Sequence, residues 1–171
     1  MTQSPSVRSR TAGMVDVGDP APDVTAPLAN GEVEEFELAD RLDEAPLVLA
    51  FFPGAFTGVC THEMETFEDR LDEFVEAGAT VLGVSVDTPF ALNAFREDSG
   101  LTFDMISDTN RRLVEAFDVS MDFASLGVDD VAKRAVFVVD EEGVVTYAWV
   151  ADDPSIEPDY DEVYEAVEAA A

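Results

Sequence analysis

The sequence predicts one α/β domain, in which a central mixed sheet is covered by helices on both faces. Two continuous apolar runs, at 47–52 and 80–86, are suited to strands that are buried on both sides. The segment between them, from 60 to about 77, spaces its apolar residues as a helix does. Strands that alternate with helices in this way predict a sheet with helices packed on both faces.

The first elements expected along the chain form an N-terminal β-hairpin. Two strand-like runs, 24–28 and 33–38, flank Asn30-Gly31, and this dipeptide favours a tight turn because it adopts positive φ angles at little cost. The buried strand at 47–52 follows, and Pro53-Gly54 ends it. The hairpin therefore precedes the central strand of the sheet along the chain.

The first long helix is expected to begin at Cys60 and to continue to about Ala77. Its apolar positions, spaced by three and four residues, are Met64, Phe67, Leu71 and Phe74. Gly78 ends this helix, and the strand at 80–86 comes next.

The rest of the chain continues the alternation of strands and helices. We expect a helix from Pro89 to about Glu97, a short strand at 103–106, a helix at 110–117, strands at 134–139 and 144–150, and a last helix at 158–169. A turn at 140–143 joins the last two strands into a hairpin. A βαβ unit followed by an antiparallel hairpin and a helix is the order of the thioredoxin fold, so we predict that fold.

Composition limits the classes of function. The chain has 171 residues, of which 47% are hydrophobic and 27% charged, as in globular domains. With 9 basic and 38 acidic residues, its net charge of −29 repels nucleic acids and anionic membrane surfaces, so neither is an expected partner. No stretch approaches the ~20 apolar residues that span a bilayer. We therefore expect a cytoplasmic protein.

The acidic charge is spread over every segment after residue 14, and Lys133 is the only lysine. This composition resembles that of halophilic proteins, in which salt screens the self-repulsion, although an acidic mesophilic protein stays the alternative. Residues 1–13 hold two arginines and no acid. We interpret them as a disordered arm, or as an extension upstream of a true start at Met14, with the domain at 14–171.

Cys60 is the residue most suited to chemistry. It is the only cysteine, which excludes an internal disulfide and a cysteine-rich metal site. We expect neither a bound metal nor a cofactor. A lone cysteine is often a small buried hydrophobic residue. Here it lies at the predicted start of a helix, where free N–H groups and the helix dipole favour the nucleophilic thiolate.

The residues before Cys60 resemble a known motif. Thr57-Gly58-Val59-Cys60 occupies the place of the C-x-x-C motif of thioredoxins, and Pro53-x-x-x-Thr57-x-x-Cys60 resembles the P-x-x-x-T-x-x-C motif of the peroxiredoxins. The resemblance continues through Ser85-Val86-Asp87 and Arg134-Ala135-Val136-Phe137, and covers about residues 14–165.

The resemblance implies a thiol-dependent peroxidase and a role for each residue of the motif. Cys60 attacks hydrogen peroxide or an organic hydroperoxide and becomes a sulfenic acid. Thr57 forms hydrogen bonds with the thiolate and the peroxide, and Pro53 shields the sulfur from water. Arg134 holds the thiolate and the polarised peroxide.

Simpler interpretations stay open for these neighbours. Thr57 could serve only as a helix N-cap, Pro53 only as the end of a strand, and Arg134 as a surface arginine. Glu63 either orients an arginine, as a glutamate does at this place in the family, or is an ordinary acid in the first turn. His62 lies two residues after Cys60. Because helical residues this close in sequence point in different directions, His62 is not expected to pair with the cysteine.

The chain has no second cysteine that could resolve Cys60. The run Ser-Val-Asp-Thr-Pro-Phe-Ala at 85–91 and the helix start Cys-Thr-His-Glu at 60–63 most resemble the one-cysteine, alkyl hydroperoxide reductase E-like branch of the family. The reductant is then an external thiol or a thioredoxin- or glutaredoxin-like protein. The resemblance also implies a homodimer or a larger homo-oligomer. The alternative function is that of a thioredoxin-fold redox sensor or binding protein, which signals through a mixed disulfide of Cys60.

Overall fold

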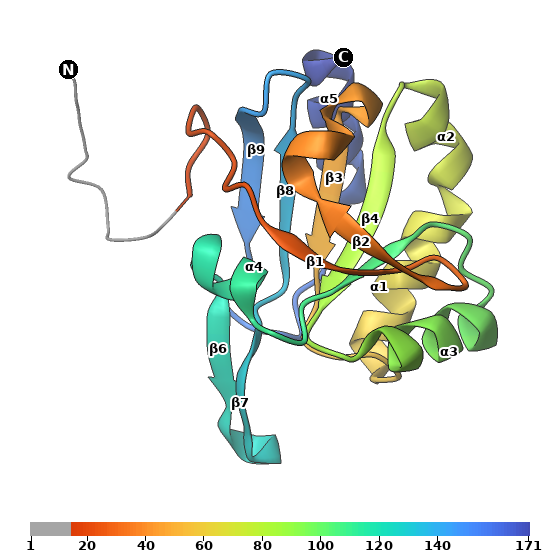
Figure 1. Ribbon diagram of the computed structural model, residues 1–171, viewed down its shortest axis with the longest axis vertical. Coiled ribbons are helices and arrows are strands. Elements are labelled where there is room, and N and C mark those ends of the chain that lie inside the picture. Colours follow the sequence, from red (N-terminus) through yellow and green to blue (C-terminus); the bar gives the residue numbers. More distant parts are fainter. Residues whose placement is uncertain (1–14) are drawn as a thin grey trace.

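The computed structural model describes residues 15–171, and its main feature is a seven-stranded mixed sheet (Figure 1). The predicted arm at residues 1–13 lies outside the described part. The order of the sheet is β2-β1-β5-β4-β3-β8-β9, and β6 and β7 form a separate pair. The strands are β1 (Thr25–Ala29), β2 (Val33–Glu37), β3 (Leu47–Phe51), β4 (Thr80–Ser85), β5 (Met105–Ser107), β6 (Ser120–Phe123), β7 (Val128–Ala132), β8 (Ala135–Val139) and β9 (Val145–Val150).

Helices lie on both faces of the main sheet. They are α1 (Gly58–Asp69), α2 (Leu71–Glu76), α3 (Pro89–Ser99), α4 (Arg112–Ala116) and α5 (Tyr160–Ala170), with short 3₁₀ segments η1 (Leu38–Glu44) and η2 (Ala124–Leu126). Within residues 15–171, no helix has the length and apolar character needed to cross a bilayer.

The central strand β3 shows how the core is divided. Val48 and Ala50 point to the face covered by α1, α2, α3 and α5, whereas Leu47, Leu49 and Phe51 point to the face covered by α4 and η1. All five residues are buried, as the apolar run predicts. Because β3 pairs in parallel with β4 and antiparallel with β8, the sheet is mixed. The predicted thioredoxin fold with an N-terminal β-hairpin is confirmed.

The prediction of one continuous helix from Cys60 to Ala77 is wrong. The structure starts α1 two residues earlier and breaks the helix at Arg70, whose φ of −103° and ψ of 7° are not helical. The guanidinium of Arg70 is instead held by Glu73, at 3.2 Å, and by Asp161 of α5, at 2.9 Å. The break turns α2 toward the C-terminal helix, a contact that the helical spacing of apolar residues does not reveal.

The β6–β7 hairpin was not predicted from the sequence. It extends away from the main sheet in Figure 1, and its pairing is irregular between Met121 and Phe123. Gly127, with a φ of +70°, lies at its tip, between η2 and β7. Val131 and Ala132 at its base are buried, which anchors the hairpin to the body of the domain.

Candidate active site

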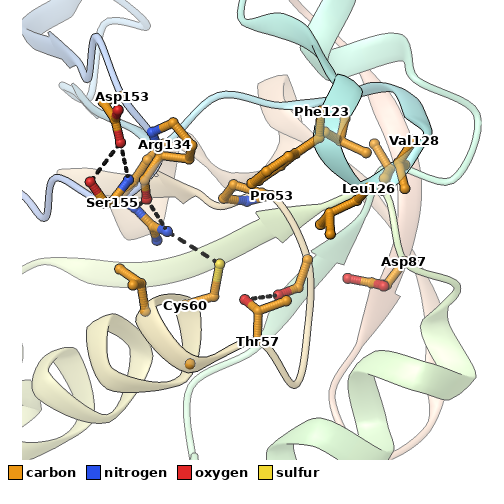
Figure 2. Close-up of a pocket in the computed structure, with 16 residues that line it drawn as sticks. Pro53, Thr57, Cys60, Asp87, Phe123, Leu126, Val128, Arg134, Asp153 and Ser155 are labelled. Carbon is orange, nitrogen blue, oxygen red and sulfur yellow. Dashed lines mark hydrogen bonds between the residues drawn. The ribbon is translucent and has the colours of Figure 1, made fainter.

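Cys60 lies in the first turn of α1, at the inner end of a cavity of about 550 Å³ (Figure 2). The chain leaves β3 at Phe51, passes through the loop 53–57 and enters α1 at Gly58. The Cys60 side chain is 1% exposed. The N–H groups of this first turn precede the hydrogen-bonded part of the helix, so they are available to an anionic group at the sulfur.

Arg134 contacts the sulfur directly. It precedes β8, and because Ala135 pairs with Phe51, the register of the sheet places it beside the loop that leads to Cys60. Its Nη2 donates to Cys60 Sγ at 3.4 Å. Arg134 is 2% exposed, so its interpretation as a surface arginine is wrong.

Glu63 is also buried, one turn further along α1, and its Oε1 accepts from Arg134 Nη1 at 2.6 Å. Its Oε2 is a buried atom without a hydrogen-bond partner among the described residues. Burial raises the pKa of Glu63 to about 8, although the charge of Arg134 opposes this shift. Burial alone would lower the pKa of Arg134, but the charges of Glu63 and Cys60 outweigh it and raise that pKa. Glu63 is therefore not an ordinary surface acid of a first helical turn.

A backbone carbonyl completes the surroundings of Arg134. Pro154 O, in the segment between β9 and α5, accepts from Arg134 Nε at 3.0 Å and from Nη2 at 2.7 Å. The guanidinium is thus fixed by a carboxylate on one side and a carbonyl on another, with the sulfur as its third partner. The role of Pro154 could not be predicted from the sequence, because a backbone carbonyl can accept a hydrogen bond whatever the residue type.

Thr57 and Pro53 lie on the same cavity as Cys60 and Arg134. Thr57 is at the N-cap position of α1, but its side chain makes no capping bond and donates to Gly54 O at 2.9 Å. Pro53 lies two residues after the end of β3 and forms part of the cavity wall. The structure therefore brings all four predicted site residues together around one opening.

Asp87 anchors the loop that carries Pro53 and Thr57. Its Oδ2 accepts from the Ala55 N–H at 2.8 Å and from the Ser85 hydroxyl at 2.6 Å. The next residue of the loop, Phe56, has a φ of +69°, a left-handed conformation that a bulky residue adopts only when its surroundings impose it. In the sequence, Ser85-Val86-Asp87 is only one part of the family resemblance, and no role at the site was predicted for Asp87.

His62 does not form a cysteine–histidine pair. Its side chain is 67% exposed, and its Nδ1 lies 2.8 Å from Oε1 of Glu157. Across residues 15–171, no group of three or more histidine, cysteine or acidic side chains is arranged to hold a metal ion.

The family model and the curated relatives that match this chain agree with one another. The model of the AhpC/TSA family matches residues 17–148. A chloroplastic 2-cysteine peroxiredoxin of Chattonella marina var. antiqua is 37% identical over 144 residues, which are 80% of this chain and 71% of the relative. A putative peroxiredoxin of Mycobacterium tuberculosis strain H37Rv is 38% identical over 133 residues, 77% of this chain and 82% of the relative.

A solved structure from the same kind of protein is also similar to this chain. The reduced 2-Cys peroxiredoxin of Plasmodium vivax superposes with a TM-score of 0.80 at 26% identity, over 90% of this chain and 80% of that one. Two of these three proteins are named for two cysteines, whereas this chain has one.

Proposed function

Because this chain belongs to the AhpC/TSA family, the peroxiredoxins, and is a thiol-dependent peroxidase, we propose that it works by a one-cysteine mechanism at Cys60. Its substrates are hydrogen peroxide and organic hydroperoxides. The observation that carries the proposal is the 3.4 Å contact between Arg134 Nη2 and the sulfur of the only cysteine, at the inner end of an open cavity.

In the first half-reaction, the Cys60 thiolate attacks the terminal oxygen of the peroxide. An S–O bond forms and the O–O bond breaks, so that the sulfur loses two electrons and becomes a sulfenic acid. The other oxygen leaves as hydroxide or alkoxide and takes a proton from solvent to give water or an alcohol. Such a displacement needs donors on both oxygens as negative charge moves from the sulfur to the leaving group.

The residues around the sulfur supply these donors. Arg134 is positively charged and fixed by Glu63 and Pro154 O, so it holds the thiolate and the polarised peroxide without having to reorganise. The Thr57 hydroxyl, which lines the cavity and is bound to Gly54 O, turns toward a bound peroxide. Pro53 shields the thiolate from water.

The second half-reaction uses an external thiol, because Cys60 has no second cysteine in the chain to resolve it. The sulfenic acid condenses with this thiol to form a mixed disulfide and water. A second thiol then releases Cys60 as a thiol and carries away the external disulfide. A small thiol, or a thioredoxin- or glutaredoxin-like protein, can serve as the reductant in this step. This mechanism agrees with a place for the chain in the one-cysteine, alkyl hydroperoxide reductase E-like branch.

Other features of the proposal follow from composition and family. A net charge of −29 with a single lysine supports a protein adapted to high salt. We place the protein in the cytoplasm, which supplies the thiols that the mechanism requires. We also propose a homodimer or a larger homo-oligomer, because members of the family commonly form such assemblies.

Stopped-flow oxidation of the reduced protein tests the proposal. Fast, stoichiometric formation of a Cys60 sulfenic acid, followed by repeated turnover with a small thiol, is the expected result, and Cys60→Ser is the control that removes both. A redox sensor that signals through a Cys60 mixed disulfide would form the disulfide without repeated turnover. That outcome would replace the peroxidase mechanism by the sensor.

A further inference from the structure

The cavity above Cys60 has a wall that the reaction with hydrogen peroxide does not require. It is lined by Phe123, Leu126, Val128 and Val131, which all come from the β6–β7 hairpin and its tip. Figure 2 shows the first three of them on this side of the cavity. Leu126 is 64% exposed and Val128 is 40% exposed. Exposed large apolar side chains that line one cavity indicate contact with an apolar group.

We propose that this hairpin binds the apolar group of an uncharged organic hydroperoxide, and that acids on the cavity wall reject hydroperoxides that carry a carboxylate. The inference rests on the proposed function, because it assumes that the peroxide oxygen reacts at Cys60. It adds the class of organic substrate and the residues that select it.

The connection between the hairpin and the reacting atoms fixes the orientation of the substrate. Val131, near the end of β7, is buried and lies three residues before Arg134, which contacts the sulfur. From this base the apolar side chains of the hairpin extend outward to Leu126 at its tip. A hydroperoxide with its O–O group at Cys60 and Arg134 therefore places its carbon group against the hairpin.

The charges on the cavity wall oppose an anionic substrate. Asp87 and Asp153 both line the cavity, and Asp153 is exposed. Arg134 is the only cationic residue among the lining residues, and its guanidinium already contacts Glu63 and Pro154 O. Among the described lining residues, a carboxylate held against the hairpin would face two acids and no cation except Arg134, in the field of a strongly negative protein.

Three peroxides separate the effects of size and charge: hydrogen peroxide, cumene hydroperoxide and cumene hydroperoxide with a para-carboxylate. The last two have nearly the same shape, and their peroxide groups lie far from the ring substituent. Stopped-flow oxidation of Cys60 should be at least about tenfold faster with the uncharged compound at 0.1 M salt, and the difference should narrow at molar salt as charges are screened.

Variants of the hairpin and the acidic wall test the residues. In Leu126→Asn/Val128→Thr, both side chains keep their approximate size and lose apolar character, so the rate ratio of cumene hydroperoxide to hydrogen peroxide should fall about tenfold. Asp153→Asn keeps an acceptor for Ser155, to which Asp153 is bonded at 2.6 Å, and should narrow the gap between the two cumene compounds. Val75→Thr, an exposed position on α2 outside the cavity, is the control and should change neither ratio.

The outcomes are distinct. Equal rates for the uncharged and carboxylate compounds, or an unchanged ratio in the hairpin variant, would overturn the inference and leave the peroxidase intact. A hairpin variant that changes the sedimentation coefficient but not the ratio would assign the wall to a subunit contact, which also overturns it. Failure of every peroxide to oxidise Cys60 would overturn the proposed function together with the inference.

Discussion

Arg134 and Glu63 form a buried hydrogen-bonded pair, with 2.6 Å between Arg134 Nη1 and Glu63 Oε1, directly beside the Cys60 thiol. Both side chains are almost completely buried. A buried pair of this kind gains little net stability, because desolvation offsets the attraction, but it fixes geometry. Here the fixed group is the guanidinium that contacts Cys60, so the pair couples the stability of the fold to the arrangement of the site.

The first prediction concerns Glu63→Gln and pH. Burial raises the pKa of Glu63 from 4.5 to about 8, so the native state keeps a proton that the unfolded chain releases between these values. The wild-type protein therefore loses stability from this group as pH rises through that window, and Glu63→Gln does not. The stability of the variant relative to wild type should rise by about 1.4 kcal/mol per pH unit between pH 5.5 and 7.5, measured by urea unfolding. A difference that does not change with pH would contradict the raised pKa.

The second prediction concerns Arg134. Arg134→Lys keeps a positive charge but cannot contact Cys60, Glu63 and Pro154 O at once, so peroxide oxidation should slow roughly 10²–10³-fold in a folded protein. Arg134→Ala leaves the buried carboxyl of Glu63 without its hydrogen-bond partner and should destabilise the fold by about 1–3 kcal/mol. From the sequence alone, this alanine variant would be expected only to slow the reaction. Wild-type rates in the lysine variant would remove Arg134 from the mechanism.

The third prediction concerns Asp87 as the anchor of the loop 53–57. Asp87→Ala releases the Ala55 N–H and the loop that carries Thr57, so peroxide oxidation should slow roughly 10- to 100-fold. Alkylation of Cys60 by iodoacetamide, which needs no donor from Thr57, should change less than about twofold. A merely destabilised protein would alter both reactions together.

Asp87→Asn is the matched control for that prediction. Its amide oxygen can still accept from Ala55, whereas the negative charge is gone. A rate close to wild type would assign the effect to the hydrogen bond, and a rate as low as that of the alanine variant would assign it to the charge.

The sequence predicted the fold and three of the four cavity residues from local signals, whereas Arg134 was predicted only from the family resemblance. The apolar run at 47–52 indicates a buried strand, and the spacing of Pro53, Thr57 and Cys60 is itself a motif. For Glu63, pairing with an arginine was one of two interpretations that the sequence left open. The sequence could not decide between them, because Glu63 and Arg134 lie 71 positions apart. Which acid of an acidic chain is buried depends on tertiary packing.

The β6–β7 hairpin was missed for a different reason. Its strands are short and irregular, and Asp129 and Asp130 interrupt the alternation of apolar and polar residues in the second strand. Four of its apolar residues line a cavity, and only its base is packed into the core, so neither periodicity nor burial marks it as a strand. The part of the site that we assign to substrate selection therefore had the weakest signal in the sequence.

The fourth prediction concerns salt. A net charge of −29 repels itself within the compact state, and added salt screens this repulsion. Raising KCl from 0.1 to 2 M should stabilise the fold by about 2 kcal/mol or more, which for a domain of this size raises Tm by roughly 4–8 °C. Sorbitol at equal osmolarity is the control, because it does not screen charge. An equal response to both solutes would contradict adaptation to salt.

The last prediction concerns the oxidised sulfur. Cys60 is buried at the inner end of its cavity, so the sulfurs of two folded subunits cannot reach bonding distance. One equivalent of peroxide without a reductant should therefore leave a monomeric chain on a non-reducing gel, with a mass increased by one oxygen. Excess peroxide should add a second oxygen as sulfinic acid, and a small thiol supplied before that step should restore the original mass. The same oxidation in urea, where the thiol is accessible, should give covalent dimers. Quantitative dimer formation by the folded protein would contradict the one-cysteine mechanism.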